Sequence, residues 1–539
     1  MSRRGETRDG AEAASLPMGA SPLAVEDGSE TRGPPHAHGP KRLSGIDVAR
    51  GATAMVSTRV VGALLALGLE VLLVRWLAPG DWDAMARFLT LGALLAIAQL
   101  GLPESIVFAS ARTGSARTAV RLGVRTSVVL AVAGVALSAA VAFVPVLRRN
   151  LLGVDDVVLR LALLPYATAE LGQSVVPSVL LACRRPRTAA LVSLLVRVPP
   201  AMGVLAALVL GGGLPAVLWA VSLGAFVSFV LGWALTAASL RAVLAGEPAS
   251  VRVGWRDQLA FALPIGLSRL VGIVNARVDN YVVMLVLAGQ AAYGTYYLGA
   301  TELALPGWIA TAVTSILAPD FVALAGTDRT ALLRSWHRSI EKTALVVLPI
   351  FLFVELHAPT LFEAMYGPEH VGAAEQYRVW QLLLPWRVTV WGSIALALGL
   401  PRVPLVTVLL ALLINGVLSY PLALAWGATG ASVASVVGGY VASVYILARL
   451  RRALGVAWEQ LLPWRGLGRI VPVAAAALLP TLLPLALPLP APARLSICIL
   501  AYIPSFLALG ARTGLLGAED RAFVRGLWRL EFLRPSSGD

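Results

Sequence analysis

The stretch 267-LSRLVGIVNARVDNYVVMLVLAG-289 decides the fold class of this chain. It is mostly apolar and long enough to cross a bilayer, since about 20 apolar residues span the hydrocarbon core. The same stretch carries Arg269, Asn275, Arg277, Asp279 and Asn280. A charged residue at the centre of a membrane helix costs roughly 2.5–3.5 kcal/mol on insertion scales. We therefore predict a membrane helix whose polar side faces protein or water and whose apolar side suits lipid.

The rest of the chain has the composition of a membrane protein. Its 539 residues are 58% hydrophobic and 14% charged, with a mean hydropathy of +0.77, whereas soluble proteins carry roughly 25% charged residues. The net charge of +14 is explained by arginines in cytoplasmic loops rather than by nucleic-acid binding. Cys183 and Cys498 are too far apart to indicate a disulfide framework or a metal site. The sequence gives no reason to expect a metal, a cofactor or a nucleic-acid partner.

The apolar runs predict an all-α polytopic membrane protein with about 14 transmembrane helices. If the N-terminus is cytoplasmic, roughly four times as many Lys and Arg fall in cytoplasmic as in outer segments, which predicts that both termini are cytoplasmic. Trp380 and Trp386 lie near span ends and are predicted to anchor helices at the membrane interface. The predicted spans are 53–74, 88–109, 124–147, 157–182, 188–211, 214–240, 259–287, 295–318, 343–358, 380–400, 403–425, 428–448, 470–489 and 495–514.

The chain also contains an internal repeat. The matches are colinear: RVVG at 59–62 with RLVG at 269–272, Pro-Arg at 186–187 with 401–402, and Gly212 with Gly427. They predict two six-helix lobes of the same orientation, related by a pseudo-twofold axis along the membrane normal, with a ligand site at their interface. The predicted parts are a disordered cytoplasmic tail at 1–45, a first lobe at 46–245, a second lobe at 246–455, and two C-terminal helices with a cytoplasmic tail at 456–539.

Four segments carry a resemblance to a known family. They are ARGATAMVSTRVVGALLALGLEVLLVRWLAPGDW at 49–82, LGLPESIVFASAR at 100–112, ARVDNYVVMLVLAGQAAYGTYYLGATEL at 276–303 and LPRVPLVTVLLALLINGVLSYPLALAWGATGASVAS at 400–435. Over about 45–455 the chain resembles the Wzx-type polysaccharide flippases of the MATE-like superfamily, which export O-antigen and capsule repeat units. One departure is Trp82-Asp83, where the family often has an aromatic residue followed by glycine.

The resemblance implies a transporter that works by alternating access between two lobes. Its expected substrate is an undecaprenyl-diphosphate-linked oligosaccharide, which it would flip across the bacterial inner membrane during lipopolysaccharide or capsule assembly. The expected partners are this substrate and membrane lipids, with a glycan polymerase and other polysaccharide-assembly proteins as candidates.

The polar intramembrane residues are the candidate site. Arginine offers a planar fork of donors that fits phosphate oxygens. We expect Arg277, Arg269, Arg59 and Asn280 to line the cavity between the lobes and bind the diphosphate, with Arg59 and Arg269 facing each other on the cytoplasmic side. Asp279 or Glu302 is the candidate for a coupling cation or proton, and Glu302 is also a candidate partner of Arg277. The alternative is that these residues form salt bridges between the lobes and only gate the cavity.

Other functions are weighed against the flippase. A multidrug or peptidoglycan-precursor exporter of the same superfamily is the first alternative, although arginines in the spans disfavour a drug site. A membrane glycosyltransferase, polymerase or ligase would need a sizeable outer loop or domain, and the sequence has neither this nor a glycine-rich phosphate loop, HExxH or G-x-S-x-G motif. No catalytic residue and no enzymatic activity are therefore expected. A scaffold without transport activity would not need charged residues inside its spans.

Overall fold

The structure is a computed structural model that describes residues 45–148, 151, 157–245, 253–286 and 293–517. Within these ranges some helix residues, including Arg59 and Arg269, are described by their backbone alone. The predicted tail at 1–45 and the end of the chain at 518–539 lie outside the described residues, apart from Gly45. The part from Gly45 onward is one compact unit. Among the described residues there are helices and no strands, so the all-α prediction is confirmed.

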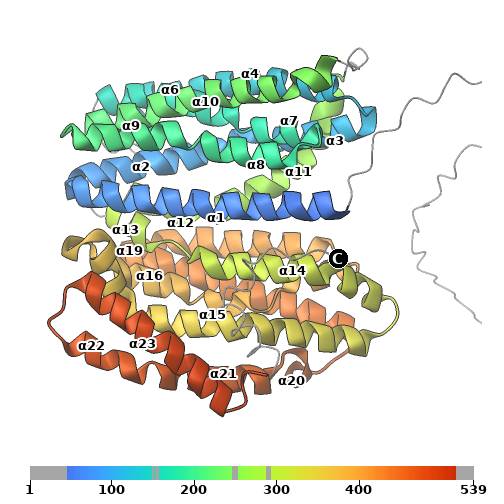
Figure 1. The fold of residues 1–539 in the computed structure, drawn as a ribbon, viewed down its shortest axis with the longest axis vertical. Coiled ribbons are helices and arrows are strands. Elements are labelled where there is room, and N and C mark those ends of the chain that lie inside the picture. The colour runs from blue at the N-terminus through green and yellow to red at the C-terminus, as the bar shows by residue number, and fades with distance from the viewer. Residues whose placement is uncertain (1–44, 149–150, 152–156, 246–252, 287–292, 518–539) are drawn as a thin grey trace, which may run out of the picture. The chain divides into compact units, whose positions relative to one another are not determined.

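The helices from α1 to α10, called the first half here, pack side by side (Figure 1). Within them α6 packs against both α4 and α10. Their bounds are α1 Gly45–Trp76, α2 Pro79–Leu95, η1 Ala96–Gln99, α3 Leu102–Thr113, α4 Ala116–Phe143, α5 Pro145–Leu147, α6 Val157–Gln173, α7 Val176–Ala182, α8 Pro186–Leu195, α9 Val198–Val209 and α10 Leu214–Ala245.

The helices from α11 to α19 are called the second half here. The carboxylate of Asp328 caps α15 by accepting the backbone N–H groups of Thr330 and Ala331 at 2.8 and 2.9 Å. The bounds are α11 Trp255–Asn275, α12 Val278–Val286, α13 Tyr293–Gly299, α14 Ala304–Ala325, α15 Arg329–Tyr366, η3 Pro368–His370, α16 Ala373–Gln381, α17 Leu384–Arg387, α18 Trp391–Ala397 and α19 Arg402–Leu454.

The C-terminal helices pack on α15 of the second half (Figure 1). The Tyr502 hydroxyl donates to the carbonyl of Pro349 at 2.9 Å, and a ring nitrogen of His357 lies 2.9 Å from the Thr481 hydroxyl. These contacts give hydrogen-bond partners to buried polar side chains between α15 and the C-terminal helices. The bounds are α20 Trp458–Leu461, α21 Trp464–Ala477, η4 Leu479–Thr481, α22 Leu482–Ala486 and α23 Ala491–Arg512.

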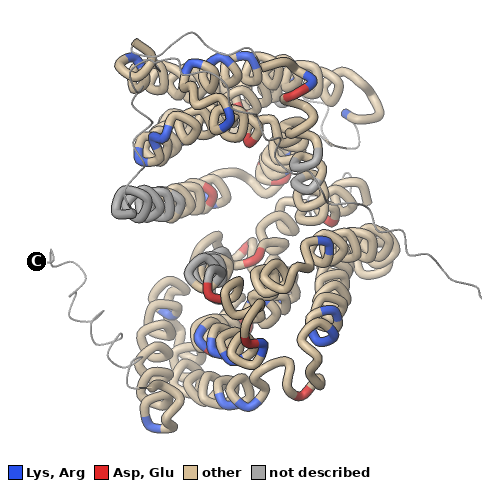
Figure 2. Tube along the Cα trace, turned by 90° about the vertical axis from the view of Figure 1, so that its right-hand side faces the viewer, with Lys and Arg blue, Asp and Glu red and all other residues tan. Residues whose placement is uncertain are grey.

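Eight helical segments of the described chain are long and apolar enough to cross a membrane. The chain is therefore a multi-pass membrane protein, as predicted, but the expected count of about 14 spans is not confirmed. Lys and Arg recur at the helix ends that face the viewer in Figure 2. The eight segments are Pro79–Thr113, Ala116–Phe143, Pro186–Val209, Leu214–Ala245, Arg329–Tyr366, Arg402–Leu454, Trp464–Ala486 and Ala491–Arg512.

Some predicted spans are broken. The predicted span 259–287 is not one helix, because α11 ends at Asn275 and α12 begins at Val278. The Arg277 N–H donates to the carbonyl of Val274, three residues back, at 3.1 Å. This tighter turn interrupts the α-helix, so the prediction of one continuous helix over 259–287 was wrong.

In α19 two helices follow each other without a loop. They meet at a sharp kink at Gly427, where φ is 62° and ψ is −143°, which agrees with the predicted break between the spans 403–425 and 428–448. Only glycine adopts this backbone conformation without steric cost. Its predicted repeat mate, Gly212, lies in the connection between α9 and α10. Both glycines thus lie where one helix direction gives way to another. The connection at 246–252 lies outside the described residues, and the division into two six-helix lobes stays a prediction.

The two halves approach closely where α11 meets η1 and α3. A Cβ on Gly266 would lie 2.2 Å from the carbonyl oxygen of Leu100, and a Cβ on Gly101 would lie 2.5 Å from that of Ala262. Gly101 also has a φ of 72°. Neither backbone could come this close with a side chain in place.

A second contact between the halves uses Trp82 and Asp83. The backbone N–H of Gly294 donates to the Asp83 carboxylate at 2.8 Å, and the Trp82 indole donates to the Gly294 carbonyl at 3.1 Å. Arg87 is buried beside them, 2.8 Å from the Asp83 carboxylate and 5.2 Å from the centre of the Tyr293 ring. Removing one partner of a buried ion pair costs about 3–5 kcal/mol, so this contact is an important part of the interface.

Candidate functional site

A cavity of about 400 Å³ in the second half contains Arg277 and is called the Arg277 cavity here. All of its described lining residues come from 275–443, so the cavity is lined by the second half and not by both halves as expected. Its polar and aromatic lining residues are Asn275, Arg277, Thr301, Glu302, Trp380, Trp386, Arg387, Trp391, Thr407, Asn415, Ser435 and Ser443.

Arg277 lies in the turn between α11 and α12. Its guanidinium makes no hydrogen bond or salt bridge with a described residue, although Glu70 and Asp279 are close enough to attract it electrostatically. The side chain is half-buried and reaches the cavity. It therefore supplies donors and a positive charge that a ligand could use.

Glu302 lines the same cavity but is paired with another residue. It lies in the connection between α13 and α14, where two nitrogens of Arg387 donate to its two carboxylate oxygens at 2.7 and 2.6 Å. Arg387 is half-exposed, so the pair contributes at most about 1 kcal/mol to stability. The expected partnership of Glu302 with Arg277 is thus replaced by a bidentate pair with Arg387.

A strained turn holds this side of the cavity. Val390, between α17 and α18, has a φ of 46°, which is a genuine outlier for a β-branched residue and costs about 1–3 kcal/mol. The buried Trp336 indole donates to the carbonyl of Thr389 at 2.7 Å and so anchors the turn. Trp386 and Trp391 flank it and line the cavity.

Asp279 and Asn280 lie elsewhere, packed against tyrosines of α13. Both side chains are buried, and neither is among the lining residues of the Arg277 cavity. The Tyr296 hydroxyl donates to Asp279, and the Tyr293 hydroxyl donates to the Asn280 side-chain oxygen at 3.2 Å. Arg277 lies in the turn before α12 whereas Asp279 lies in its first turn, so the helix break separates the two side chains.

The predicted site residues therefore fall into three groups. The structure brings Arg277 and Glu302 to one cavity. It places Asp279 and Asn280 among the tyrosines of α13. The backbones of Arg59 and Arg269 lie in α1 and α11, and their side chains lie outside what is described.

Sequence reasoning missed Arg387, Trp386 and Trp391 as cavity residues. Their signal was the density of Trp and Arg around Pro385 in a run interpreted as one span. The structure divides that run into short helices, and their ends turn these side chains toward the cavity.

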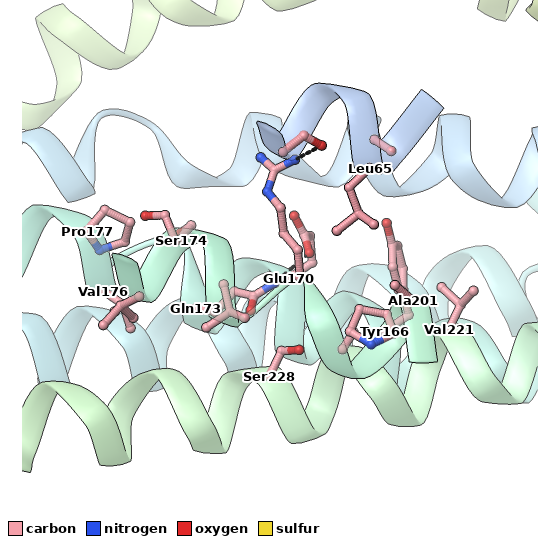
Figure 3. A pocket seen from close by; sticks show the side chains of 18 of the residues that line it. Leu65, Tyr166, Glu170, Gln173, Ser174, Val176, Pro177, Ala201, Val221 and Ser228 are labelled. Carbon is pink, nitrogen blue, oxygen red and sulfur yellow. Dashed lines mark hydrogen bonds between the residues drawn. The ribbon is translucent and has the colours of Figure 1, made fainter. Parts of the chain in front are cut away.

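A second cavity, of about 500 Å³, lies within the first half and is called the Glu170 cavity here. Figure 3 shows Glu170 and Gln173 of α6 facing it, with Leu65 of α1 on the opposite side. The Gln173 amide donates to Glu170 at 2.7 Å. Arg197, between α8 and α9, donates to the carbonyl of Gly62 in α1 at 3.2 Å, the bond dashed in Figure 3.

The α15–α16 connection carries one acidic residue, Glu369, and a histidine, His370. His370 is buried there, and burial lowers the pKa of its imidazole, which favours the neutral form. Among the described residues no group of three or more His, Cys, Asp or Glu is placed to hold a metal ion.

The described charges of the two cavities differ. The Arg277 cavity has Arg277, Arg387 and Glu302, a net charge of one positive unit. The Glu170 cavity has Glu170 and Arg197, which cancel. An anionic ligand group is therefore better matched by the Arg277 cavity.

Comparison with known proteins identifies the family. The family model described as polysaccharide biosynthesis protein matches residues 48–324. The chain belongs to this family. As a member of the polysaccharide biosynthesis protein family, it fits the resemblance found in the sequence. No curated protein matches the chain.

Solved structures of low sequence identity share the fold of this polysaccharide biosynthesis protein. One is described as "Lipid II flippase MurJ, inward closed conformation", with a TM-score of 0.65 and 15% identity over 86% of this chain and 98% of that chain. Another is an inward-facing multidrug resistance MATE family transporter of the MOP superfamily, with a TM-score of 0.55 and 16% identity over 75% of this chain and 99% of that one. At this identity the likeness concerns the fold.

Proposed function

We propose that this protein flips an undecaprenyl-diphosphate-linked oligosaccharide across the bacterial inner membrane by alternating access. Membership of the polysaccharide biosynthesis family and a fold shared with a lipid II flippase support a lipid-linked substrate. The observation that carries the proposal is Arg277, a guanidinium without a described hydrogen-bond or salt-bridge partner in a cavity of positive net charge. Such a group suits phosphate oxygens.

The remaining site residues have proposed roles around Arg277. Arg59 and Arg269 would capture the substrate on the cytoplasmic side, and Asn280 would assist binding. Asp279 or Glu302 would bind the coupling cation or proton. The burial of Asp279 supports this role, because a buried carboxylate gains most from a nearby cation.

Topology and partners complete the proposal. The basic helix ends of Figure 2 would face the cytoplasm, together with both termini. The substrate would be an O-antigen or capsule repeat unit handed on to a glycan polymerase. The protein would act without a catalytic residue or cofactor.

An exporter of a peptidoglycan precursor is the second candidate. The superfamily that the chain resembles has a peptidoglycan-precursor branch in which two further helices follow the twelve of the repeat. The apolar segments Trp464–Ala486 and Ala491–Arg512, which follow the predicted repeat, therefore favour this candidate. A multidrug exporter is disfavoured, since the positive Arg277 cavity does not suit cationic drugs. The identity of the translocated substrate distinguishes these candidates.

The test is translocation of lipid-linked oligosaccharide in cells that carry Arg277→Ala or Asp279→Asn at normal protein levels. We expect glycan export to fall about 100-fold in Arg277→Ala, because a lost charged contact costs about 2–5 kcal/mol. Arg402→Ala is the matched control, since Arg402 is exposed at the start of α19 and does not line the cavity. Unimpaired export in both site variants would refute the cavity assignment.

A further inference from the structure

Three tryptophans give the Arg277 cavity an aromatic lining. Trp380, Trp386 and Trp391 come from α16, α17 and α18. An indole combines a large apolar face with one hydrogen-bond donor. The Trp380 indole nitrogen is buried and has no hydrogen-bond partner. The lining therefore offers flat apolar surface.

The Arg387–Glu302 pair adds polar groups of both kinds to this lining. Arg387 donates through only two of its N–H groups, and Glu302 accepts on both oxygens with lone pairs to spare. A hydroxyl group can accept from the guanidinium and donate to the carboxylate. Neighbouring hydroxyls on a ring are thus the natural partners of this pair, which carries no net charge.

The geometry of this lining is fixed by the turn at Val390. Its positive φ and the bond from Trp336 to Thr389 hold Trp386, Arg387 and Trp391 in place. Backbone strain of this kind persists only where the surrounding structure requires it. A rigid support is what a binding surface needs, because side chains already in place lose less entropy on binding.

We propose that Trp380, Trp386, Trp391 and the Arg387–Glu302 pair form a binding surface for a neutral pyranose ring. The proposal rests on the proposed function and names the sugar next to the diphosphate as the occupant. Arg277 faces the diphosphate, whose negative charges already exceed the single net positive charge of the cavity. A carboxylated sugar would compete with Glu302 for Arg387 and bring a further negative charge into the cavity. The indole faces pack on the C–H face of the ring, and the ion pair binds its hydroxyls.

The test is saturation-transfer NMR with the purified full-length protein in nanodiscs. The probes are methyl β-D-glucopyranoside, which is neutral, and methyl β-D-glucuronide, which carries a carboxylate. We expect transfer to the neutral probe, reduced about fivefold in Trp386→Ala and in Glu302→Gln, because each lost contact is worth roughly 1 kcal/mol. Trp386→Phe, which keeps an aromatic face, is expected to bind within about twofold of the unmodified protein. Trp426→Ala is the matched control, since Trp426 is exposed on α19 and does not line the cavity.

Three outcomes would overturn the proposal: no transfer to the neutral probe, equal transfer in Glu302→Gln, or stronger transfer to the glucuronide. Translocation of lipid-linked oligosaccharide, measured on the same preparations in proteoliposomes, separates this proposal from the proposed function. Translocation without sugar binding refutes the binding surface alone. Sugar binding without translocation refutes the flippase alone.

Discussion

The Glu170 cavity lies in the first half of the chain and the Arg277 cavity in the second half. The two cavities differ in how their charged side chains are paired. In the Glu170 cavity, Arg197 donates to a backbone carbonyl of α1 and Glu170 accepts from Gln173. In the Arg277 cavity, Glu302 and Arg387 satisfy each other and Arg277 is left over. Both charged side chains of the Glu170 cavity therefore have hydrogen-bond partners in the protein, whereas Arg277 has no described hydrogen-bond or salt-bridge partner.

The two halves differ in how the arginines of their cavities are paired. Arg197 is exposed and donates to a backbone carbonyl of α1, so it links α1 to the junction of α8 and α9 without a ligand. The predicted repeat pairs Arg277 with Leu67, an uncharged residue of the first half. The arginine without a described partner therefore belongs to the second half, and the proposed site is asymmetric.

The largest expected effect comes from reversing the charge of Arg277. In Arg277→Glu the Arg277 cavity changes from one net positive to one net negative charge, and translocation should fall about 100-fold or more. Arg197→Gln in the Glu170 cavity should leave translocation within about threefold, since that arginine serves packing. Initial rates in proteoliposomes at matched protein content would measure both. Comparable losses in the two variants would show that the cavities are functionally equivalent.

A smaller effect is expected from removing the negative charge of the Arg277 cavity. Glu302→Gln frees Arg387 and raises the net charge of the cavity by one unit, so a prenyl diphosphate should bind about fivefold more tightly, the equivalent of roughly 1 kcal/mol of Coulomb energy. Glu170→Gln should not change this affinity. Titration with farnesyl diphosphate at low and high salt gives the measurement, and the gain should shrink as salt rises. A gain in both variants would argue against a specific role of Arg387.

The smallest effect tests the structural role of Arg197. In Gly62→Ala the new Cβ would lie 3.2 Å from the Arg197 guanidinium, and the displaced hydrogen bond should cost about 1 kcal/mol of stability. Gly68→Ala on the same helix has nothing within 4 Å and should gain about 0.5–1 kcal/mol from helix propensity. Gly62→Ala gains the same helix propensity, so it should be less stable than Gly68→Ala by about 1 kcal/mol, and thermal unfolding in detergent would measure this difference. Equal shifts would mean that the Arg197 contact contributes nothing.

Much of the fold was predictable because long apolar runs indicate membrane spans. The helical class, the membrane character and the family all followed from segments such as 400–435, and they are confirmed. The kink at Gly427 was also predicted, because this glycine lies between the predicted spans 403–425 and 428–448. Local sequence carries such information directly.

The site was only partly predictable, because it depends on where helices break. The break at 276–277 contains neither Pro nor Gly, so nothing local announced it. It separates Arg277 from Asp279 and Asn280, which pack on the tyrosines of α13. The pairing of Arg387 with Glu302 joins residues 85 positions apart, and no spacing rule reveals such a contact.

The contact of Asp83 with Gly294 has a consequence for natural sequence variation. The carboxylate accepts the Gly294 N–H, while a Cβ on Gly294 would lie 2.6 Å from the Trp82 ring. A relative with a larger residue at 294 must therefore replace Trp82 as well, and a relative without an acidic residue at 83 needs another acceptor for that N–H. Substitutions at positions 82, 83 and 294 should therefore occur together across the family, because the three residues must fit one another where the two halves meet.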